Sequence, residues 1–371
     1  MFDITKIARQ CILNIKPYVP GKPVEEVKRE LGLTDVLKLA SNENPLGASP
    51  MAIEAMIKDL QDNANYYPES LCPALTKKLG QQHQLDPSHF FVSNGVDGVI
   101  SMIGLAFIEI NDEVVTSQYS FFAYQNVTAR MGGRINLIPQ TTDLSFDIDR
   151  IIASVTSKTK AVFLCNPNNP TGTITRRNDF EKLLAALPEN TLLISDEAYY
   201  QFANDPDYPQ TVPYLDNHPN LIITRTFSKV MGLAGLRIGY AIAHPDIIST
   251  LRKVMDPFPV NRTAQAGAIA SLDDSEFLER SIRVVVEGRS QLYQGLVKLG
   301  LKTSPSQTNF VFVDLERLST PIYNAMLLEG VIVRPMEPQG LPTCLRITVG
   351  TKEQNTRALD ALARALGFKG D

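Results

Sequence analysis

Short apolar runs that alternate with helix-like segments constrain the fold of this chain more than any other feature. Six such runs lie between residues 89 and 243: HFFVSNG, DEVVTS, KAVFLCN, TLLISDEAYY, LIITRTFS and RIGYAIA. Most of them are apolar on both faces, as is typical of strands in the middle of a layered domain. The segments VISMIGLAF and DFEKLLAAL carry apolar residues at helical spacing. This alternation predicts an α/β fold whose large domain has a mostly parallel, doubly wound sheet.

The C-terminal part of the chain follows a different pattern. The runs TNFVFVDL, GVIVRPM and CLRITVG are strand-like, with amphipathic helices predicted in PIYNAMLLEG and EQNTRALDALARAL. This indicates a second, smaller α+β domain. The N-terminal residues are rich in proline and charge and predict an arm. We therefore expect an arm at residues 1–41 that packs with the small domain, a large domain at 42–262 and a small domain at 263–371.

Composition excludes several classes of protein. Of 371 residues, 44% are hydrophobic and 20% charged, and the net charge of −4 gives no basic surface for nucleic acid or anionic membranes. No apolar run reaches the length of a membrane span, and CILNI near the N-terminus is too short for a signal sequence, so we expect a cytoplasmic protein. The four cysteines and four histidines are dispersed, which predicts neither disulfides nor a metal site.

Polar residues interrupt the apolar runs where four of the predicted strands end. They are Ser93 to Gly95 after FFV, Asn166 to Asn169 after VFLC, Asp196 and Glu197 after LLIS, and Thr226, Ser228 and Lys229 after LIITR. Ligands of open α/β sheets bind beyond the carboxyl ends of the strands. The sequence therefore predicts one crevice that receives side chains from four strand ends.

The residues of this crevice have ordinary structural explanations when taken singly. Glycines in SNGVDGVISM could serve only the strand-to-helix turn, CNPNNPTGT is also a rigid turn, and Lys229 could be an exposed lysine. Together they match what pyridoxal 5′-phosphate (PLP) needs. These needs are a lysine for a Schiff base, an aspartate for the ring nitrogen, an asparagine and a tyrosine for the ring oxygen, and a helix start with hydroxyls and an arginine for the phosphate.

At the level of whole motifs the chain resembles the fold-type I, PLP-dependent aminotransferases of class I and II. The motifs are CNPNNPTG, SDEAYY, TFSKVMGLAGLRIGYA and LRITVGT, and the resemblance covers nearly the whole chain. Within that family, LASNENPLG together with PYVPGK and LRITVG points to the histidinol-phosphate branch. The resemblance implies ping-pong transamination of L-histidinol phosphate with 2-oxoglutarate to imidazole-acetol phosphate and L-glutamate, a step of histidine biosynthesis.

The resemblance also implies a role for each matching residue. Lys229, Asp196 and Tyr199 are the implied catalytic residues, through the Schiff base, the ring nitrogen and the ring oxygen respectively. The remaining implied cofactor-binding residues are Asn169 on the ring oxygen, Phe121 on the ring face, and Gly95, Val96, Asp97, Thr226, Ser228, Arg237 and Tyr67 on the phosphate. Tyr67 is implied to reach the phosphate from a neighbouring subunit, so the implied assembly is a homodimer.

Substrate binding is implied for Arg346, Arg334, Tyr18, Asn44 and Asn169. Gly98 departs from the family pattern, because many members carry an acidic residue there, and this bears on substrate preference. Three alternatives stay open: an aromatic amino-acid (phenylalanine or tyrosine) aminotransferase, a PLP-dependent threonine-phosphate decarboxylase, and a PLP-binding regulator without catalysis.

Overall fold

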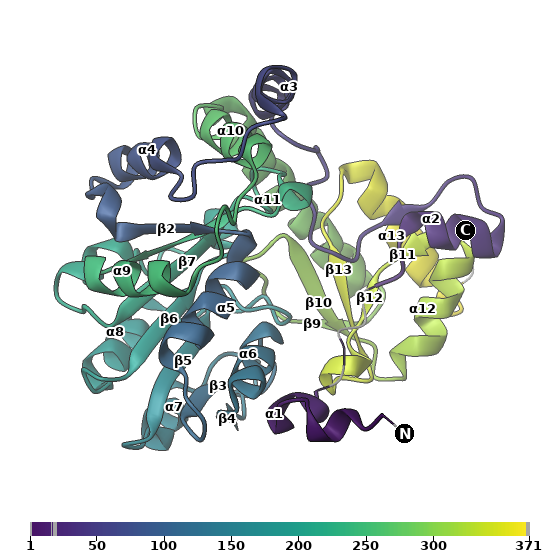
Figure 1. Cartoon of the computed structure of the whole chain (residues 1–371). Coiled ribbons are helices and arrows are strands. Elements are labelled where there is room, and N and C mark those ends of the chain that lie inside the picture. The colour runs from purple at the N-terminus through teal and green to yellow at the C-terminus, as the bar shows by residue number, and fades with distance from the viewer. Residues whose placement is uncertain (1, 16, 18–20, 369–371) are drawn as a thin grey trace.

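The computed structural model describes residues 2–15, 17 and 21–368 of the chain. Its largest sheet has seven strands in the order β2-β8-β7-β6-β5-β3-β4 (Figure 1). The strands are β2 (Phe90–Ser93), β3 (Glu113–Ser117), β4 (Arg134–Ile138), β5 (Thr159–Cys165), β6 (Leu192–Asp196), β7 (Leu221–Thr226) and β8 (Gly239–Ala243). The predicted α/β class is confirmed. Sequence patterns missed β4 because it is an edge strand with two exposed residues and no continuous apolar run.

The direction of the strands explains why polar residues gather at one edge of this sheet. Strands β3 to β7 run parallel, so β5, β6 and β7 end side by side, with Cys165 opposite Asp196 and Asp196 opposite Thr224. Strand β8 runs antiparallel to both of its neighbours and begins at Gly239, which lies opposite both Ser93 and Thr226. The start of the helix after β2 is thereby placed beside the end of β7.

Eight helices of the large domain cover this sheet or pack beside it. They are α3 (Pro50–Asn63), α4 (Pro73–His83), α5 (Gly95–Phe107), α6 (Ala123–Met131), α7 (Ile148–Ser154), α8 (Arg177–Ala186), α9 (Pro245–Val254) and α10 (Arg262–Ser271). Every residue of β2, β6, β7 and β8 is buried, so both faces of the sheet are covered. Buried strands of this kind need no polar alternation, which is why their sequences read as continuous apolar runs.

The C-terminal part forms a separate four-stranded antiparallel sheet in the order β12-β13-β10-β9, beside the large sheet in Figure 1. Its elements are α11 (Ser275–Lys298), β9 (Lys302–Thr303), β10 (Phe310–Asp314), α12 (Ser319–Leu328), β11 (Val331–Ile332), β12 (Arg334–Pro335), β13 (Cys344–Thr348) and α13 (Lys352–Ala365). The run GVIVRPM divides between two sheets, because β11 pairs with β1 (Leu37–Lys38) and β12 with β13.

The two helices of the N-terminal region lie against different parts of the molecule. In α1 (Gln10–Leu13), the Sγ of Cys11 is 3.5 Å from the carbonyl oxygen of Arg130 in α6. In α2 (Val24–Leu31), Val27 is buried in a cluster with Leu327 and Ile332 of the small domain. The arm therefore contacts both domains, and the domain boundaries drawn from the sequence stay a prediction. None of the helices among the described residues is long and apolar enough to span a membrane.

Candidate active site

A cavity of about 370 Å³ opens where the ends of β5, β6 and β7 face the small domain. Its wall takes residues from the large domain, from the small domain and from the segment before α3. Twelve of the residues singled out from the sequence line it: Val96, Asp97, Phe121, Asn169, Asp196, Tyr199, Thr226, Ser228, Lys229, Arg237, Arg334 and Arg346. The crevice predicted from the strand ends is thus present as a single cavity.

Lys229 is held in an environment that disfavours its charge. It follows β7 by three residues, lies half-buried in the cavity wall, and its Nζ is 5.7 Å from the centroid of the Tyr199 ring. Burial is the largest cause that lowers the pKa of Lys229 to about 8, and the guanidinium groups of Arg346 and Arg237 contribute to the same shift. Near neutral pH a usable fraction of this amine is therefore an uncharged nucleophile and base.

Asp196 ends β6 and is almost completely buried. The hydroxyl of Tyr124 donates to its Oδ2 at 2.6 Å, and the backbone N–H of Ala198 donates to its Oδ1 at 3.3 Å. Burial raises the pKa of Asp196 to about 6, and these two hydrogen bonds oppose the rise. Sequence reasoning missed Tyr124. Its signal is weak: a buried tyrosine needs a partner for its hydroxyl, but the sequence does not say which one.

The start of α5 forms an open cradle for an anion. The side chain of Asn94 does not cap the helix, and a Cβ on Gly95, which has φ +75°, would lie 2.8 Å from Nη2 of Arg237. Arg237 Nη2 is also 3.1 Å from Oδ2 of Asp97. Across the cradle, the N–H of Ser228 donates to the hydroxyl of Thr226 at 3.0 Å. Uncapped helix N–H groups, two hydroxyls and a guanidinium are the donor set that phosphate prefers.

Gly98 packs against β2 and does not line the cavity. A Cβ at this position would lie 2.6 Å from Oγ of Ser93 and 3.5 Å from Cβ of Asn94. The missing side chain would therefore start toward the end of β2, and Ser93 would have to shift to admit an acidic residue.

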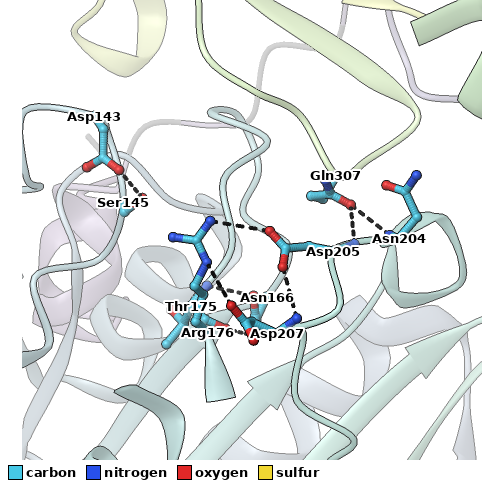
Figure 2. A network of polar contacts seen from close by, with 9 residues as sticks. All are labelled: Asp143, Ser145, Asn166, Thr175, Arg176, Asn204, Asp205, Asp207 and Gln307. Atoms are coloured by element: carbon cyan, nitrogen blue, oxygen red, sulfur yellow. Dashed lines mark hydrogen bonds and ion pairs between the residues drawn. The ribbon is translucent and has the colours of Figure 1, made fainter. Parts of the chain in front are cut away.

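The loop that carries Asn169 is closed by hydrogen bonds at its base (Figure 2). Asn166 Nδ2 donates to the carbonyl of Thr175 at 3.0 Å, and the N–H of Thr175 donates back to Asn166 Oδ1 at 2.9 Å. Next to Thr175, Arg176 forms an ion pair of 3.3 Å with Asp205. These contacts fix both ends of the loop, so that Asn169 is presented to the cavity from a rigid turn.

A second set of contacts ties this loop to the small domain. Gln307 Oε1 accepts from the N–H groups of Asn204 at 2.7 Å and Asp205 at 3.3 Å (Figure 2). The N–H of Gln307 donates to the carbonyl of Gly172 at 2.8 Å. Gly172 has φ +79°, and a Cβ there would lie 2.5 Å from Ser306 Oγ, so only glycine fits this close approach.

Two arginines face the cavity from adjacent strands of the small domain. Arg334 of β12 and Arg346 of β13 are direct cross-strand partners. Arg346 donates to Asn169 Oδ1 at 2.6 Å and to the carbonyl of Ala40 at 2.8 Å. Arg334 forms no ion pair with a carboxylate of the described residues. Like charges placed opposite each other destabilise a strand pair, so this arrangement indicates a binding site for an anion.

Three described residues to which the sequence assigned a binding role do not line this cavity. Asn44 donates from Nδ2 to the carbonyl of Val230 at 2.8 Å and to the hydroxyl of Ser281 at 3.0 Å, a geometry that does not support a substrate-binding role. Gly95 is the first residue of α5 and directly precedes Val96, which does line the cavity. Tyr67 is 79% exposed and stacks on Phe258, with ring centroids 4.7 Å apart. Tyr18 lies outside the described residues.

Several residues of the wall were not anticipated from the sequence. They include Asn42, Glu43, Ser120, Phe122, Cys165, Met336 and Gln339. Asn42 contacts the hydroxyl of Tyr199 directly, at 3.0 Å from its Nδ2. It lies two residues before the asparagine that sequence reasoning selected from the same motif, SNENP. Among the described residues there is no group of three His, Cys, Asp or Glu side chains arranged to hold a metal ion.

Comparison with known proteins gives a consistent picture. Residues 34–362 match the family described as aminotransferase class I and II. A histidinol-phosphate aminotransferase of Moorella thermoacetica is 42% identical over 359 residues, which cover 96% of this chain and 92% of that protein. Histidinol-phosphate aminotransferase 1 of Nitrosococcus oceani is 41% identical and covers 97% of both chains. The crystal structure of the Sinorhizobium meliloti histidinol-phosphate aminotransferase in complex with pyridoxal 5′-phosphate superimposes with a TM-score of 0.89, at 28% identity and 97% coverage of both chains.

Proposed function

Because the chain belongs to the class I and II aminotransferase family, we propose that it is a PLP-dependent histidinol-phosphate transaminase. It transfers the amino group of L-histidinol phosphate to 2-oxoglutarate and yields imidazole-acetol phosphate and L-glutamate, a reaction of histidine biosynthesis. The observation that carries this proposal is the cross-strand pair Arg334 and Arg346 in the wall that also holds Lys229. Two guanidinium groups suit the dianionic phosphate of this donor, whereas phenylalanine or tyrosine offers a single carboxylate.

The residues present fit PLP at the strand ends. The start of α5 offers free N–H groups where Gly95 leaves room beside Arg237, and a Cβ on Gly239 would lie 2.8 Å from the N of Val96. The cofactor phosphate would be held there by the amides of Gly95, Val96 and Asp97, the hydroxyls of Thr226 and Ser228, and the guanidinium of Arg237. When bound, PLP supplies an electron-withdrawing ring that stabilises negative charge on the donor's Cα.

Each remaining side chain has a defined part in handling the ring and the protons. Asp196 would hold the proton of the ring nitrogen, and Tyr124 keeps the carboxylate oriented by donating to its Oδ2. Tyr199 and Asn169 would hold the ring oxygen, and Phe121 would cover the ring face, since all three side chains line the cavity. Lys229 would hold the cofactor through its Nζ, and as a free, uncharged amine it would take the proton from the donor's Cα, for which a pKa of about 8 is suited.

One arginine serves both anionic substrates in this proposal. The positive charge of Arg346 contributes to the lowered pKa of Lys229, so its guanidinium acts on the part of the cavity where the lysine lies. It binds the phosphate of the donor in one half-reaction and the carboxylate of glutamate or 2-oxoglutarate in the other. Arg334 adds a second positive charge that is needed most by the phosphate.

We also propose that the chain acts as a homodimer in the cytoplasm. Exposed apolar side chains of α3, namely Met51, Ile53, Ile57 and Leu60, lie on one helix, and the stacked pair of Tyr67 and Phe258 is exposed as well. A second copy covering these residues would allow its Tyr67 to reach the cofactor phosphate. All four cysteines are free, which suits a reducing compartment. Sedimentation equilibrium tests the assembly, and a monomer at micromolar concentration would contradict it.

A comparison of amine donors tests the proposed substrate. With 2-oxoglutarate as acceptor, kcat/KM for L-histidinol phosphate should exceed kcat/KM for phenylalanine and for tyrosine by at least tenfold, because the second guanidinium gains an interaction with the dianion alone. If phenylalanine is preferred, the enzyme is an aromatic aminotransferase and the proposed donor is wrong.

A further inference from the structure

Asn42 is a residue of the cavity wall that the proposed function does not yet use. It is 2% exposed and adopts a left-handed backbone conformation, with φ +56°. Asparagine tolerates this region better than most residues, but the conformation still costs free energy relative to an extended backbone. Strained residues of this kind persist where the surrounding structure fixes them, and they cluster at functional sites.

Four hydrogen bonds fix Asn42 in this conformation. Its N–H donates to Thr348 Oγ1 at 3.0 Å, and Thr348 Oγ1 donates back to Asn42 Oδ1 at 3.1 Å. Asn309 Nδ2 donates to the carbonyl of Asn42 at 3.0 Å. The fourth bond runs from Asn42 Nδ2 to the hydroxyl oxygen of Tyr199 at 3.0 Å. The hydroxyl of Thr348 has one proton and donates it to Asn42 Oδ1, which identifies that atom as the amide oxygen. The other end of the amide, its NH₂ group, therefore faces Tyr199.

This arrangement determines what the hydroxyl of Tyr199 can do. A hydroxyl that accepts from Asn42 keeps its own proton for another acceptor. No acceptor among the described residues receives that proton, although Tyr199 is only 4% exposed and lines the cavity. The donated bond also makes the hydroxyl a better donor, since it stabilises developing charge on the oxygen.

We propose that Asn42 is a positioning residue that turns the hydroxyl of Tyr199 into an obligate donor toward the ring oxygen of the cofactor. Thr348 lies two residues beyond Arg346 on the same strand, so the contact also joins the hydroxyl to the strand that carries the substrate-binding arginine. The inference rests on the proposed function, because it needs PLP bound beside Tyr199.

An absorbance titration of the PLP-loaded protein tests this role without measuring turnover. Donation from Tyr199 stabilises the ring oxygen as an anion and so favours loss of the proton from the lysine–cofactor linkage. Loss of that donation raises the pKa read from the visible band. We expect Asn42→Gly, which keeps the left-handed backbone, to raise it by roughly half a unit to one unit, and Tyr199→Phe to raise it further. Asn111→Gly, the same change at an exposed asparagine that is also left-handed (φ +71°) and does not line the cavity, should leave it unchanged.

A double-mutant cycle separates positioning from a general structural effect. If Asn42 acts through Tyr199, Asn42→Gly adds no further shift in a Tyr199→Phe background. An equal shift in both backgrounds, or no shift in Asn42→Gly alone, overturns the proposal. If Asn42→Gly does not fold, Thr348→Val replaces it, with a smaller shift of the same sign expected. Absence of any visible band in the wild-type protein with PLP would contradict the proposed function instead.

Discussion

The two sides of strands β6 and β7 differ in whether their charged side chains form ion pairs. Along these strands successive side chains alternate, so Asp196 and Thr226 face the cavity while Glu197 and Arg225 face the other side. On the far side, Arg225 and Glu197 form an ion pair of 2.8 Å and are both almost completely buried. On the cavity side, Lys229 and Asp196 form no ion pair with each other or with any described residue of opposite charge.

Both members of the far-side pair have further partners besides each other. Glu197 also accepts from the hydroxyls of Ser195 and Thr211, and the Arg225 guanidinium lies 3.9 Å from the centroid of the Tyr200 ring. Such a pair links the ends of two strands. Its charged groups are buried and engaged with protein partners, so they are not available to bind a ligand. On the cavity side, the pKa values of Asp196 and Lys229 are shifted instead. Shifted pKa values of this kind are typical of catalytic groups. The two neighbouring acids of the motif SDEAYY therefore differ in role: Asp196 belongs to the cavity, and Glu197 stabilises the fold.

The largest effect on activity is expected from the cavity side. Lys229→Ala should abolish turnover and the visible absorbance of the lysine–cofactor linkage, because no other amine of the wall can replace Nζ. The folded state should be retained, since the substitution removes a charge that burial disfavours. Steady-state assays with absorbance spectra and a thermal melt check both expectations. Residual turnover within a factor of ten of the wild type would contradict the assignment of Lys229.

The far side should give the reverse result. Arg225→Met leaves the carboxylate of Glu197 buried without its partner and should lower the free energy of unfolding by about 3–5 kcal/mol. Replacing both residues, as Arg225→Met with Glu197→Leu, should recover part of this loss because no charge is left buried. Urea unfolding of the single and double variants measures the difference. A single variant as stable as the wild type would show that the pair does not hold the strand ends.

A smaller effect is expected from Asp196 in the protein without cofactor. Its pKa of about 6 lies above the usual 3.8, so between these values the folded state binds a proton that the unfolded state has lost. The free energy of unfolding should therefore fall as pH rises from about 4 to about 6, by up to roughly 3 kcal/mol, and then level off. Asp196→Asn should lack this dependence. A constant difference between the two proteins over this range would contradict the shifted pKa.

How much the sequence predicts differs between these features. Apolar runs identify the six buried strands, and the polar residues that end them locate the cavity, because strand direction and strand end are local properties of the chain. Asp196 and Lys229 follow from that reasoning. The edge strand β4 does not, since two of its five side chains are exposed, two more are only partly buried, and its pattern is weak.

Contacts between distant segments are what the sequence could not supply. Tyr124 is 72 residues from its acceptor Asp196, and Asn42 is 157 residues from Tyr199 and 306 from Thr348. No spacing rule encodes such pairs. Within the motif SNENP the sequence offers two asparagines of equal chemistry, and only the fold directs Asn42 into the cavity while Asn44 donates to Val230 and Ser281.

The half-reaction with the amine donor alone tests whether this site transfers the amino group of histidinol phosphate. The PLP-loaded protein is mixed with excess L-histidinol phosphate in the absence of any keto acid, and its visible band is followed with time. We predict that the band is lost with formation of one equivalent of imidazole-acetol phosphate per subunit, and that 2-oxoglutarate restores it. A band that stays unchanged with histidinol phosphate, or one that responds only to phenylalanine, would contradict the account, as would release of carbon dioxide from threonine phosphate without transamination.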